Sequence, residues 1–161
     1  ALYSDGQIDK ALSSLESLIQ NYPNEAVLFN IKGACHTELK EFNIATKNYQ
    51  TALAINPNYA EAHNNLGNAF KELNQLDDAF KSYQKALDLK PKFAEAHNNL
   101  GNIYKMLGKQ TLSIESFISA LSINPKCMFT LVYPGNLFLS ISFWLGKAVR
   151  TLITPFKAEE P

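Results

Sequence analysis

Prolines divide the chain at a constant interval of 34 residues, at Pro23, Pro57, Pro91 and Pro125. Within the same period the nine residues "AEAHNNLGN" occur twice without a change, at 60–68 and at 94–102. A period between about 20 and 50 residues is typical of repeat proteins, in which each unit must stack on its neighbours. Full units that begin three residues after a proline cover 26–59, 60–93 and 94–127, and positions within a unit are counted from 1 to 34.

Small and aromatic residues recur at fixed positions of the unit. Position 8 holds Gly33, Gly67 and Gly101, and position 27 holds Ala52, Ala86 and Ala120. Position 11 holds His36, Phe70 and Tyr104, position 20 holds Ala45, Ala79 and Ser113, and position 24 holds Tyr49, Tyr83 and Phe117. In this pattern the chain resembles the tetratricopeptide repeat (TPR) family, whose motif L-G, Y, A, F, A and P spreads over 34 residues. The resemblance covers roughly residues 2–127 and implies a right-handed α-solenoid of antiparallel helix pairs.

The residue pattern favours the same all-α fold on physical grounds. In 60–73 and in 76–89 apolar residues recur at helical spacing, as Leu66, Phe70 and Leu73 do in the first segment. The small residues at positions 8, 20 and 27 let two helices approach closely, and no pair can cover its own apolar face without a neighbour. Residues 1–25 match only the second half of a unit, which predicts that the chain is cut from a longer array.

Composition and the reactive residue types argue against several classes of function. Lys+Arg and Asp+Glu both number 15, so no electrostatic reason favours nucleic acid as a partner. Cys35 and Cys127 are too far apart for a metal-binding or redox motif. His63 and His97 at position 4 are predicted to be packing residues with satisfied hydrogen bonds, because no carboxylate or cysteine stands beside either of them at metal-ligand spacing. His36 occupies the aromatic position 11, and a packing role is predicted for it as well. We therefore predict no catalytic residue, no metal site and no cofactor, and we do not expect an enzyme.

The first helix of each unit carries the candidate binding residues. In the TPR family this helix lines the concave surface of the array, and the resemblance places its polar side chains there. The candidate peptide-binding residues are Asn30, Asn64, Asn65, Asn68, Lys71, Asn98, Asn99, Asn102 and Lys105. An amide side chain offers donors and an acceptor, and therefore matches the backbone of an extended peptide. The alternative interpretation is a neutral, solvated surface that duplication has copied.

The segment "HNNLGN" is similar to the TPR arrays of O-linked N-acetylglucosamine transferase and related bacterial proteins. In those arrays an asparagine at position 6 holds the backbone of a peptide, and the resemblance assigns this role to Asn65 and Asn99, whereas Ile31 occupies the position in the first full unit. On this hypothesis Asn65→Ala with Asn99→Ala weakens peptide binding and leaves thermal stability nearly unchanged.

Residues 128–161 have the length of one unit but not its pattern. Pro134 falls at position 7, where it would break the first helix, and the segment is rich in large apolar residues. Three interpretations are open: a cap on the array, a self-association segment, and contact with a membrane surface, which is the least favoured. Self-association would use Phe138, Phe143, Trp144 and Val149.

These features together predict a protein–protein interaction scaffold that binds an extended segment of a protein or peptide partner. One alternative is a substrate-recruiting accessory region of a larger enzyme such as a glycosyltransferase. Another is a self-associating structural segment that forms homo-oligomers through the chain ends. The compartment is undetermined, with the cytoplasm favoured.

Overall fold

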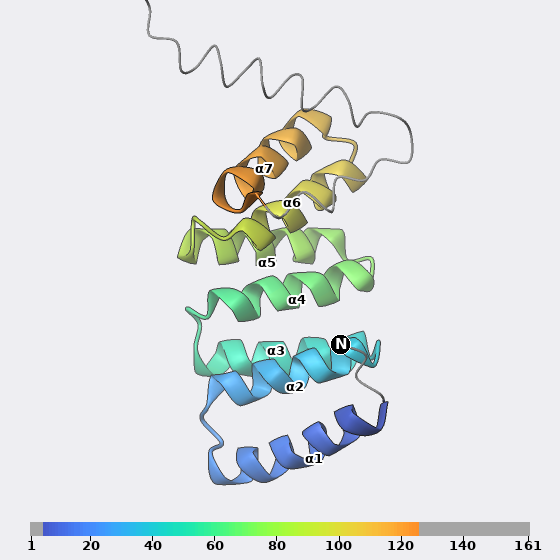
Figure 1. The fold of residues 1–161 in the computed structure, drawn as a ribbon, viewed down its shortest axis with the longest axis vertical. Helices are drawn as coiled ribbons and strands as arrows, with labels where there is room; N and C mark the ends of the chain where they lie inside the picture. Colours follow the sequence, from blue (N-terminus) through green and yellow to red (C-terminus); the bar gives the residue numbers. More distant parts are fainter. Residues whose placement is uncertain (1–4, 126–161) are drawn as a thin grey trace, which may run out of the picture. The chain divides into compact units, whose positions relative to one another are not determined.

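The computed structural model describes residues 5–125, which form seven α-helices (Figure 1). In chain order these are α1 (Asp5–Asn21), α2 (Ala26–Glu38), α3 (Phe42–Ile55), α4 (Ala60–Glu72), α5 (Leu76–Leu89), α6 (Ala94–Met106) and α7 (Gln110–Ile123). All of them belong to one compact unit, Ala1–Met128. The predictions made for 128–161, including those for Pro134, Phe138, Phe143, Trp144 and Val149, lie outside the described residues.

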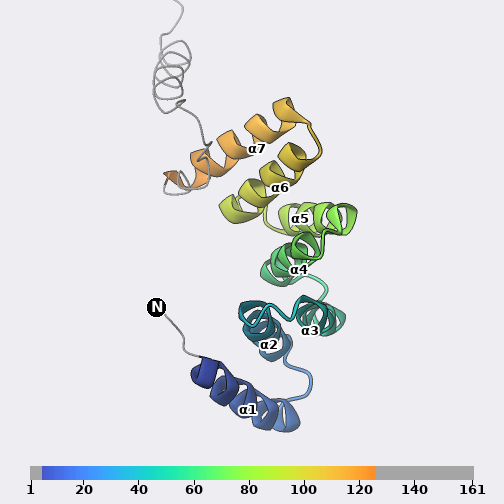
Figure 2. The same ribbon diagram turned by 90° about the vertical axis from the view of Figure 1, so that its right-hand side faces the viewer.

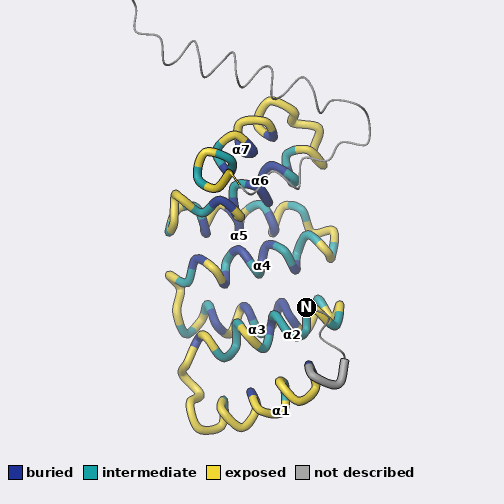
Figure 3. Tube along the Cα trace, viewed as in Figure 1, coloured by how far each residue is buried: buried dark blue, intermediate teal, exposed yellow. Residues whose placement is uncertain are grey.

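Consecutive helices pack as antiparallel pairs, α2 with α3, α4 with α5, and α6 with α7 (Figures 1 and 2). The pairs stack in chain order, because α3 also packs on α4 and α5 on α6. Smaller contacts join α2 to α4 and α4 to α6, the first helices of successive repeats. This arrangement confirms the predicted all-α solenoid for the described part of the chain. The helix α1 packs on α2 and is exposed over most of its length (Figure 3).

Each helix pair turns at position 15, where the backbone enters the left-handed region. The φ angles there are 60° at Lys40, 58° at Asn74 and 72° at Gly108. The amide of the following residue closes the end of the first helix by donating to the carbonyl of position 11, as Glu41 N does to His36 O at 2.9 Å. This six-residue hydrogen bond is the mark of a Schellman end, which satisfies a carbonyl that the helix leaves without a partner.

The glycine at position 8 lets the two helices of a pair lie against each other. A Cβ atom on Gly67 would stand 2.6 Å from a ring carbon of Tyr83, and the same holds for Gly33 against Tyr49. Tyr83 is fully buried, so its ring packs directly on the glycine backbone. The alanines at positions 20 and 27, among them Ala86, are also fully buried on this side. The close approach expected from the small residues is therefore present, and it fixes which sides of the first helices remain available to solvent.

Candidate functional site

The first helices expose one side to solvent, which points away from their paired second helices. This inner face consists of positions 2, 6, 9 and 13 of α2, α4 and α6. In α4 it comprises Glu61, Asn65, Asn68 and Glu72; in α6 it comprises Glu95, Asn99, Asn102 and Met106; in α2 it comprises Val27, Ile31, Ala34 and Glu38. Of these residues Asn99 alone is buried. In Figure 2, α2 and α4 lie on one side of the stack and α3 and α5 on the other. A partner that contacts several repeats at once would reach these side chains.

Four of the candidate asparagines bond to one another across neighbouring repeats. Asn65 Nδ2 donates to Asn30 Oδ1 at 3.0 Å, and Asn99 Nδ2 donates to Asn64 Oδ1 at 3.0 Å. In both cases position 6 of one repeat bonds to position 5 of the repeat before it. We call Asn30, Asn64, Asn65 and Asn99 the amide ladder. It links α2 to α4 and α4 to α6, where the first helices come together.

The ladder corrects one expectation about the asparagines. The resemblance placed these side chains on the concave surface, but Asn64 is only 1% exposed, and Asn98 and Asn99 are each 9% exposed. Both ends of the Asn64 amide are used inside the protein, since Asn64 Nδ2 also donates to Glu95 Oε1 at 3.1 Å. A buried amide needs such partners because leaving it unsatisfied costs free energy of folding. The role of these residues in binding a peptide stays a prediction.

Position 9 offers amides that lie outside the ladder. Asn68 and Asn102 are half-buried on the inner face. Tyr83 OH donates to Asn68 Oδ1 at 2.8 Å. This hydrogen bond fixes the orientation of the Asn68 amide. Burial raises the pKa of Tyr83 above its ordinary value, and the charges of Glu72 and Glu95 raise it further, so the hydroxyl stays protonated and remains a donor. Asn102 has no matching contact, because Phe117 stands in its repeat at the position of Tyr83 and carries no hydroxyl group.

Charged side chains at the edges of the inner face are partly paired. Lys90 Nζ lies 2.7 Å from Glu61 Oε1, and this hydrogen bond lowers the pKa of Glu61 below its usual value. Lys71 Nζ lies 3.3 Å from Glu72 Oε1. Lys71 and Lys105 occupy the same position of successive repeats, and Lys105 is exposed. The inner face of α4 and α6 thus combines amide groups with charges of both signs.

His63 and His97 have the satisfied hydrogen bonds that were predicted for them, and their partners lie in the turns between repeats. His63 Nε2 donates to the Pro57 carbonyl at 3.0 Å, and His97 Nε2 donates to the Pro91 carbonyl at the same distance. Each of these bonds ties the start of a first helix to the proline turn that precedes it. His36 behaves differently, because its Nδ1 lies 2.7 Å from Glu41 Oε2 across the turn between α2 and α3.

Metal ligands and the reactive cysteine can be examined directly within residues 5–125. Within that range no three His, Cys, Asp or Glu side chains gather where they could hold a metal ion. Burial raises the pKa of the Cys35 thiol, which disfavours the reactive thiolate. None of the helices from α1 to α7 is both long enough and apolar enough to cross a bilayer.

Sequence reasoning gave the apolar inner face of α2 no role, although it placed Ile31 at position 6, the position of the binding asparagines. Val27 and Ile31 are each 44% exposed there. A signal was present in the sequence: positions 2 and 6 are Glu and Asn in the next two units but Val and Ile in this one.

Comparison with known proteins identifies the repeat. A family profile described as "TPR repeat" matches residues 36–74 and 67–108. Profiles described as "Tetratricopeptide repeat" match residues 94–127 and 1–25. No curated protein sequence matches the chain at a significant level.

Several solved structures share the fold. One, titled "Crystal structure of MamA", has 27% sequence identity and a TM-score of 0.69, covering 76% of this chain and 72% of the MamA chain. A second, "Crystal structure of MamA protein", has 26% identity and a TM-score of 0.67 over 81% of this chain and 72% of that one. A third, "MamA 41-end from Desulfovibrio magneticus RS-1", has 24% identity and a TM-score of 0.67 over 75% and 68% of the two chains.

Proposed function

Because the chain belongs to the tetratricopeptide repeat family, we propose that it is a protein-interaction scaffold whose inner face binds an extended segment of a partner protein. The observation that carries the proposal is the repetition of one polar surface on α4 and α6. Positions 2, 6 and 9 of the inner face, together with position 12 at its edge, are Glu, Asn, Asn and Lys in both helices. Equivalent groups at a regular spacing suit the regular backbone of an extended peptide.

Within this surface, the amides of position 9 are the best placed to meet a ligand. Asn64 and Asn99 already bond to each other, so they contribute mainly by holding α4 and α6 together. Asn68 and Asn102 lie outside the amide ladder, and Lys71 and Lys105 stand one turn further along the same helices. One hydrogen bond contributes a net ~0.5–1.5 kcal/mol, so binding requires several of these groups together.

The proposal can be tested with a phage-displayed library of random dodecapeptides selected on the immobilised chain. The Kd of each enriched peptide is then measured for the wild-type chain and for the variant Asn68→Ala with Asn102→Ala. Loss of two hydrogen bonds should raise the Kd by roughly tenfold. The matched control is Gln50→Ala with Gln84→Ala, which removes two exposed amides from the second helices α3 and α5 and should leave the Kd unchanged.

Two outcomes would contradict the proposal. One is a selection from which no peptide emerges above background. The other is a set of peptides that bind the Asn68→Ala, Asn102→Ala variant and the wild-type chain with the same Kd. Thermal unfolding of each variant shows whether it keeps the wild-type fold.

A second candidate function, self-association, is favoured by the surface of α7. Ile114 and Ile118 are 58% and 51% exposed, and Leu112 is 41% exposed. In α5 the equivalents of Leu112 and Ile118 are Asp78 and Gln84. Large apolar side chains that remain exposed on the outer side of a helix are often covered by a partner.

Light scattering over a range of concentrations tests this candidate. The variant Ile118→Gln gives α7 the residue that α3 and α5 carry at the same position, Gln50 and Gln84. We expect the wild-type chain to associate at high concentration and the variant to associate less. A wild-type chain that remains monomeric at every concentration would exclude self-association as its function. Recruitment of substrates to a glycosyltransferase or another enzyme stays a prediction.

A further inference from the structure

The Asn68 amide has one favoured orientation, because a buried hydroxyl group donates to it. Tyr83 is fully buried, and its hydroxyl donates to Asn68 Oδ1 at 2.8 Å. If the amide turned over, the hydroxyl proton would have no acceptor among the residues that the structure describes, which costs free energy of folding. Asn68 Nδ2 has no partner within residues 5–125 and reaches solvent. Its two hydrogens are therefore available to a ligand.

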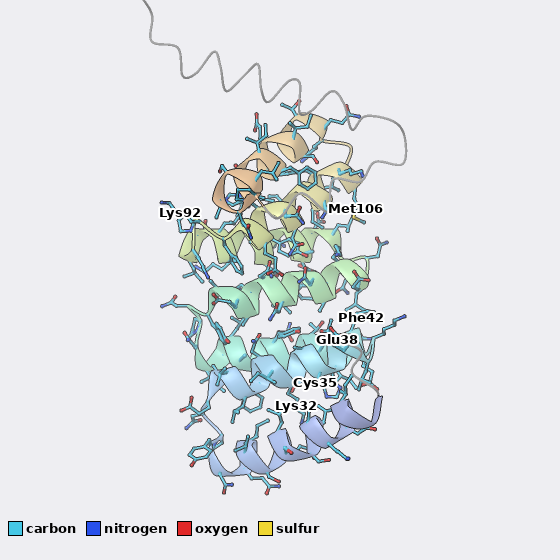
Figure 4. The ribbon with its side chains drawn as sticks, in the orientation of Figure 1. Lys32, Cys35, Glu38, Phe42, Lys92 and Met106 are labelled. Atoms are coloured by element: carbon cyan, nitrogen blue, oxygen red, sulfur yellow. The ribbon has the colours of Figure 1, made fainter. Side chains whose placement is uncertain are left out.

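This contact is specific to the repeat of α4 and α5. In the repeat before it, the hydroxyl of Tyr49 lies 3.0 Å from Thr37 Oγ1, and position 9 is Ala34. In the repeat after it, Phe117 has no hydroxyl group. The first helices α2 and α6 both pack on α4 (Figure 4). The exposure of Asn68 is therefore that of a residue inside the array, with a neighbouring repeat on each side.

The charges around this amide disfavour an anionic ligand. Burial raises the pKa of Tyr83, and Glu72 and Glu95 raise it further, so both carboxylates act on the hydroxyl that contacts Asn68. Lys71 Nζ lies 3.3 Å from Glu72 Oε1, whereas Glu95 forms no ion pair with a described residue. Two carboxylates and one ammonium group give a negative local charge, which repels a carboxylate and tolerates a neutral carbonyl oxygen.

We propose that Tyr83 is a positioning residue of the inner face, which orients the Asn68 amide so that Nδ2 donates to a backbone carbonyl oxygen of the partner. The inference rests on the proposed function and deepens it, because it names the group that is recognised and the direction of the hydrogen bond. Every residue of an extended segment offers such an oxygen. The partner is accordingly held along its length, and a C-terminal carboxylate is disfavoured at this position.

A cycle of variants tests the positioning role, with peptides enriched on the wild-type chain. Tyr83→Phe removes the hydroxyl and keeps the ring, as Phe117 does in the next repeat. The amide can then adopt both orientations, so the Kd should rise about two- to fivefold as the competent fraction falls. In an Asn68→Ala background the same change should leave the Kd unchanged, because no amide remains to be oriented. Tyr49→Phe is the matched control and should also leave the Kd unchanged.

The direction of the hydrogen bond is tested with Asn68→Asp. Tyr83 can still donate to one carboxylate oxygen, but the other oxygen can only accept. This variant should therefore raise the Kd more than Asn68→Ala does. Esters that replace the peptide amides one at a time locate the carbonyl, because an ester carbonyl is a weaker acceptor. One ester should raise the Kd for the wild-type chain and leave the Kd of Asn68→Ala unchanged.

Phe117→Tyr is the converse variant, and it keeps the test valid if Tyr83→Phe disturbs the fold. It adds the missing hydroxyl to the repeat of Asn102 and should lower the Kd about two- to fivefold. Thermal unfolding shows which variants keep the wild-type fold. A Phe117→Tyr chain that folds and binds with the wild-type Kd would contradict the positioning role.

The outcomes separate this inference from the proposed function. Peptides that require Asn68 and Asn102 but bind the folded Tyr83→Phe variant with the wild-type Kd would refute the positioning role alone. An equal rise in Kd with and without the Asn68 amide would assign the hydroxyl a purely structural role. A Kd that Asn68→Asp leaves unchanged or lowers would reverse the direction of the hydrogen bond, and a series without a sensitive ester would exclude the backbone carbonyl. A selection that yields no peptide would refute both proposals.

Discussion

The spacing of each helix pair depends on one contact between single residues, the glycine of position 8 and the aromatic ring of position 24. Gly33, Gly67 and Gly101 would each bring a Cβ atom within 2.7 Å of a ring carbon of the second helix. Such a distance is well inside van der Waals contact, and the ring of Tyr83 is fully buried, so it cannot move aside without disturbing its neighbours.

The first prediction concerns Gly67. Alanine favours the helix by about 1 kcal/mol over glycine, but overpacking a filled core typically costs about 1–3 kcal/mol. The difference is about 0–2 kcal/mol, and the 2.6 Å contact with a fully buried ring favours its upper half. We therefore expect Gly67→Ala to lower the free energy of unfolding by about 1–2 kcal/mol, measured by urea denaturation. The cost should shrink when Tyr83→Leu is added, because the ring is the obstacle. A Gly67→Ala chain as stable as wild type would show that the helices can separate freely.

The second prediction concerns the turn at position 15, where Lys40 and Gly108 share a positive φ. The left-handed conformation destabilises a residue with a Cβ atom by about 1–2 kcal/mol, whereas glycine adopts it without this penalty. We expect Lys40→Gly to stabilise the chain by about 0.5–1 kcal/mol and Gly108→Ala to destabilise it by about 1 kcal/mol. A Cβ atom on Gly108 would meet no atom within 4 Å, so that change reports backbone conformation alone.

Chemical denaturation of the two variants measures both effects. Asn74→Gly is the control and should change stability little, because asparagine tolerates the left-handed region better than most residues. A destabilised Lys40→Gly variant would contradict the prediction, since it would mean that the lysine side chain contributes more than its backbone conformation costs.

At the scale of helices, the amide ladder joins elements that are distant in the sequence. Position 5 of one first helix bonds to position 6 of the next, from Asn30 to Asn65 and from Asn64 to Asn99. The pattern explains why "AEAHNNLGN" keeps two adjacent asparagines: one faces the following helix and the other faces the preceding helix. The ladder supports the stacking and sets the register between first helices.

The third prediction follows from the ladder. Asn99→Ala leaves the buried Asn64 Oδ1 without its donor, which should lower the free energy of unfolding by about 1–3 kcal/mol. Asn102→Ala, at a half-buried position outside the ladder, should change it by no more than about 0.5 kcal/mol. This differs from the expectation that removing Asn65 and Asn99 leaves stability unchanged. Thermal unfolding of the two variants tests the prediction. If Asn99→Ala proved as stable as Asn102→Ala, water would have replaced the hydrogen bond that Asn64 lost.

Taken as a whole, the described residues form a linear stack in which each helix pair touches only its neighbours. The pair α4–α5 has repeats on both sides, whereas α1 packs on α2 alone. Stability in such a stack is close to a sum of repeat terms and nearest-neighbour interfaces. Elements with fewer interfaces open locally at lower free energy.

The fourth prediction is a gradient of hydrogen exchange. Backbone amides in α4 and α5 should exchange most slowly, and those in α1 should exchange much faster. Exchange followed by NMR at neutral pH measures each helix separately. Equal protection of α1 and α4 would mean that the array opens only as one cooperative unit.

The sequence by itself determined the fold. The interval of 34 residues, with glycine at position 8, small residues at 20 and 27 and an aromatic residue at 24, is a local and periodic signal. The glycine and the aromatic residue meet within one helix pair, and the small residues also pack on the next repeat, as Ala52 does on Ala62. Because every one of them recurs at a fixed position, the packing could be inferred from the period alone. The satisfied role of His63 and His97 could be inferred in the same way, from the absence of ligand residues beside them.

Only the tertiary structure decided what the asparagines do. Asn64 and Asn65 are identical residues side by side in the sequence, and hydropathy cannot distinguish a buried, satisfied amide from an exposed one. The difference arises because their partners, Asn99 and Asn30, come from other repeats.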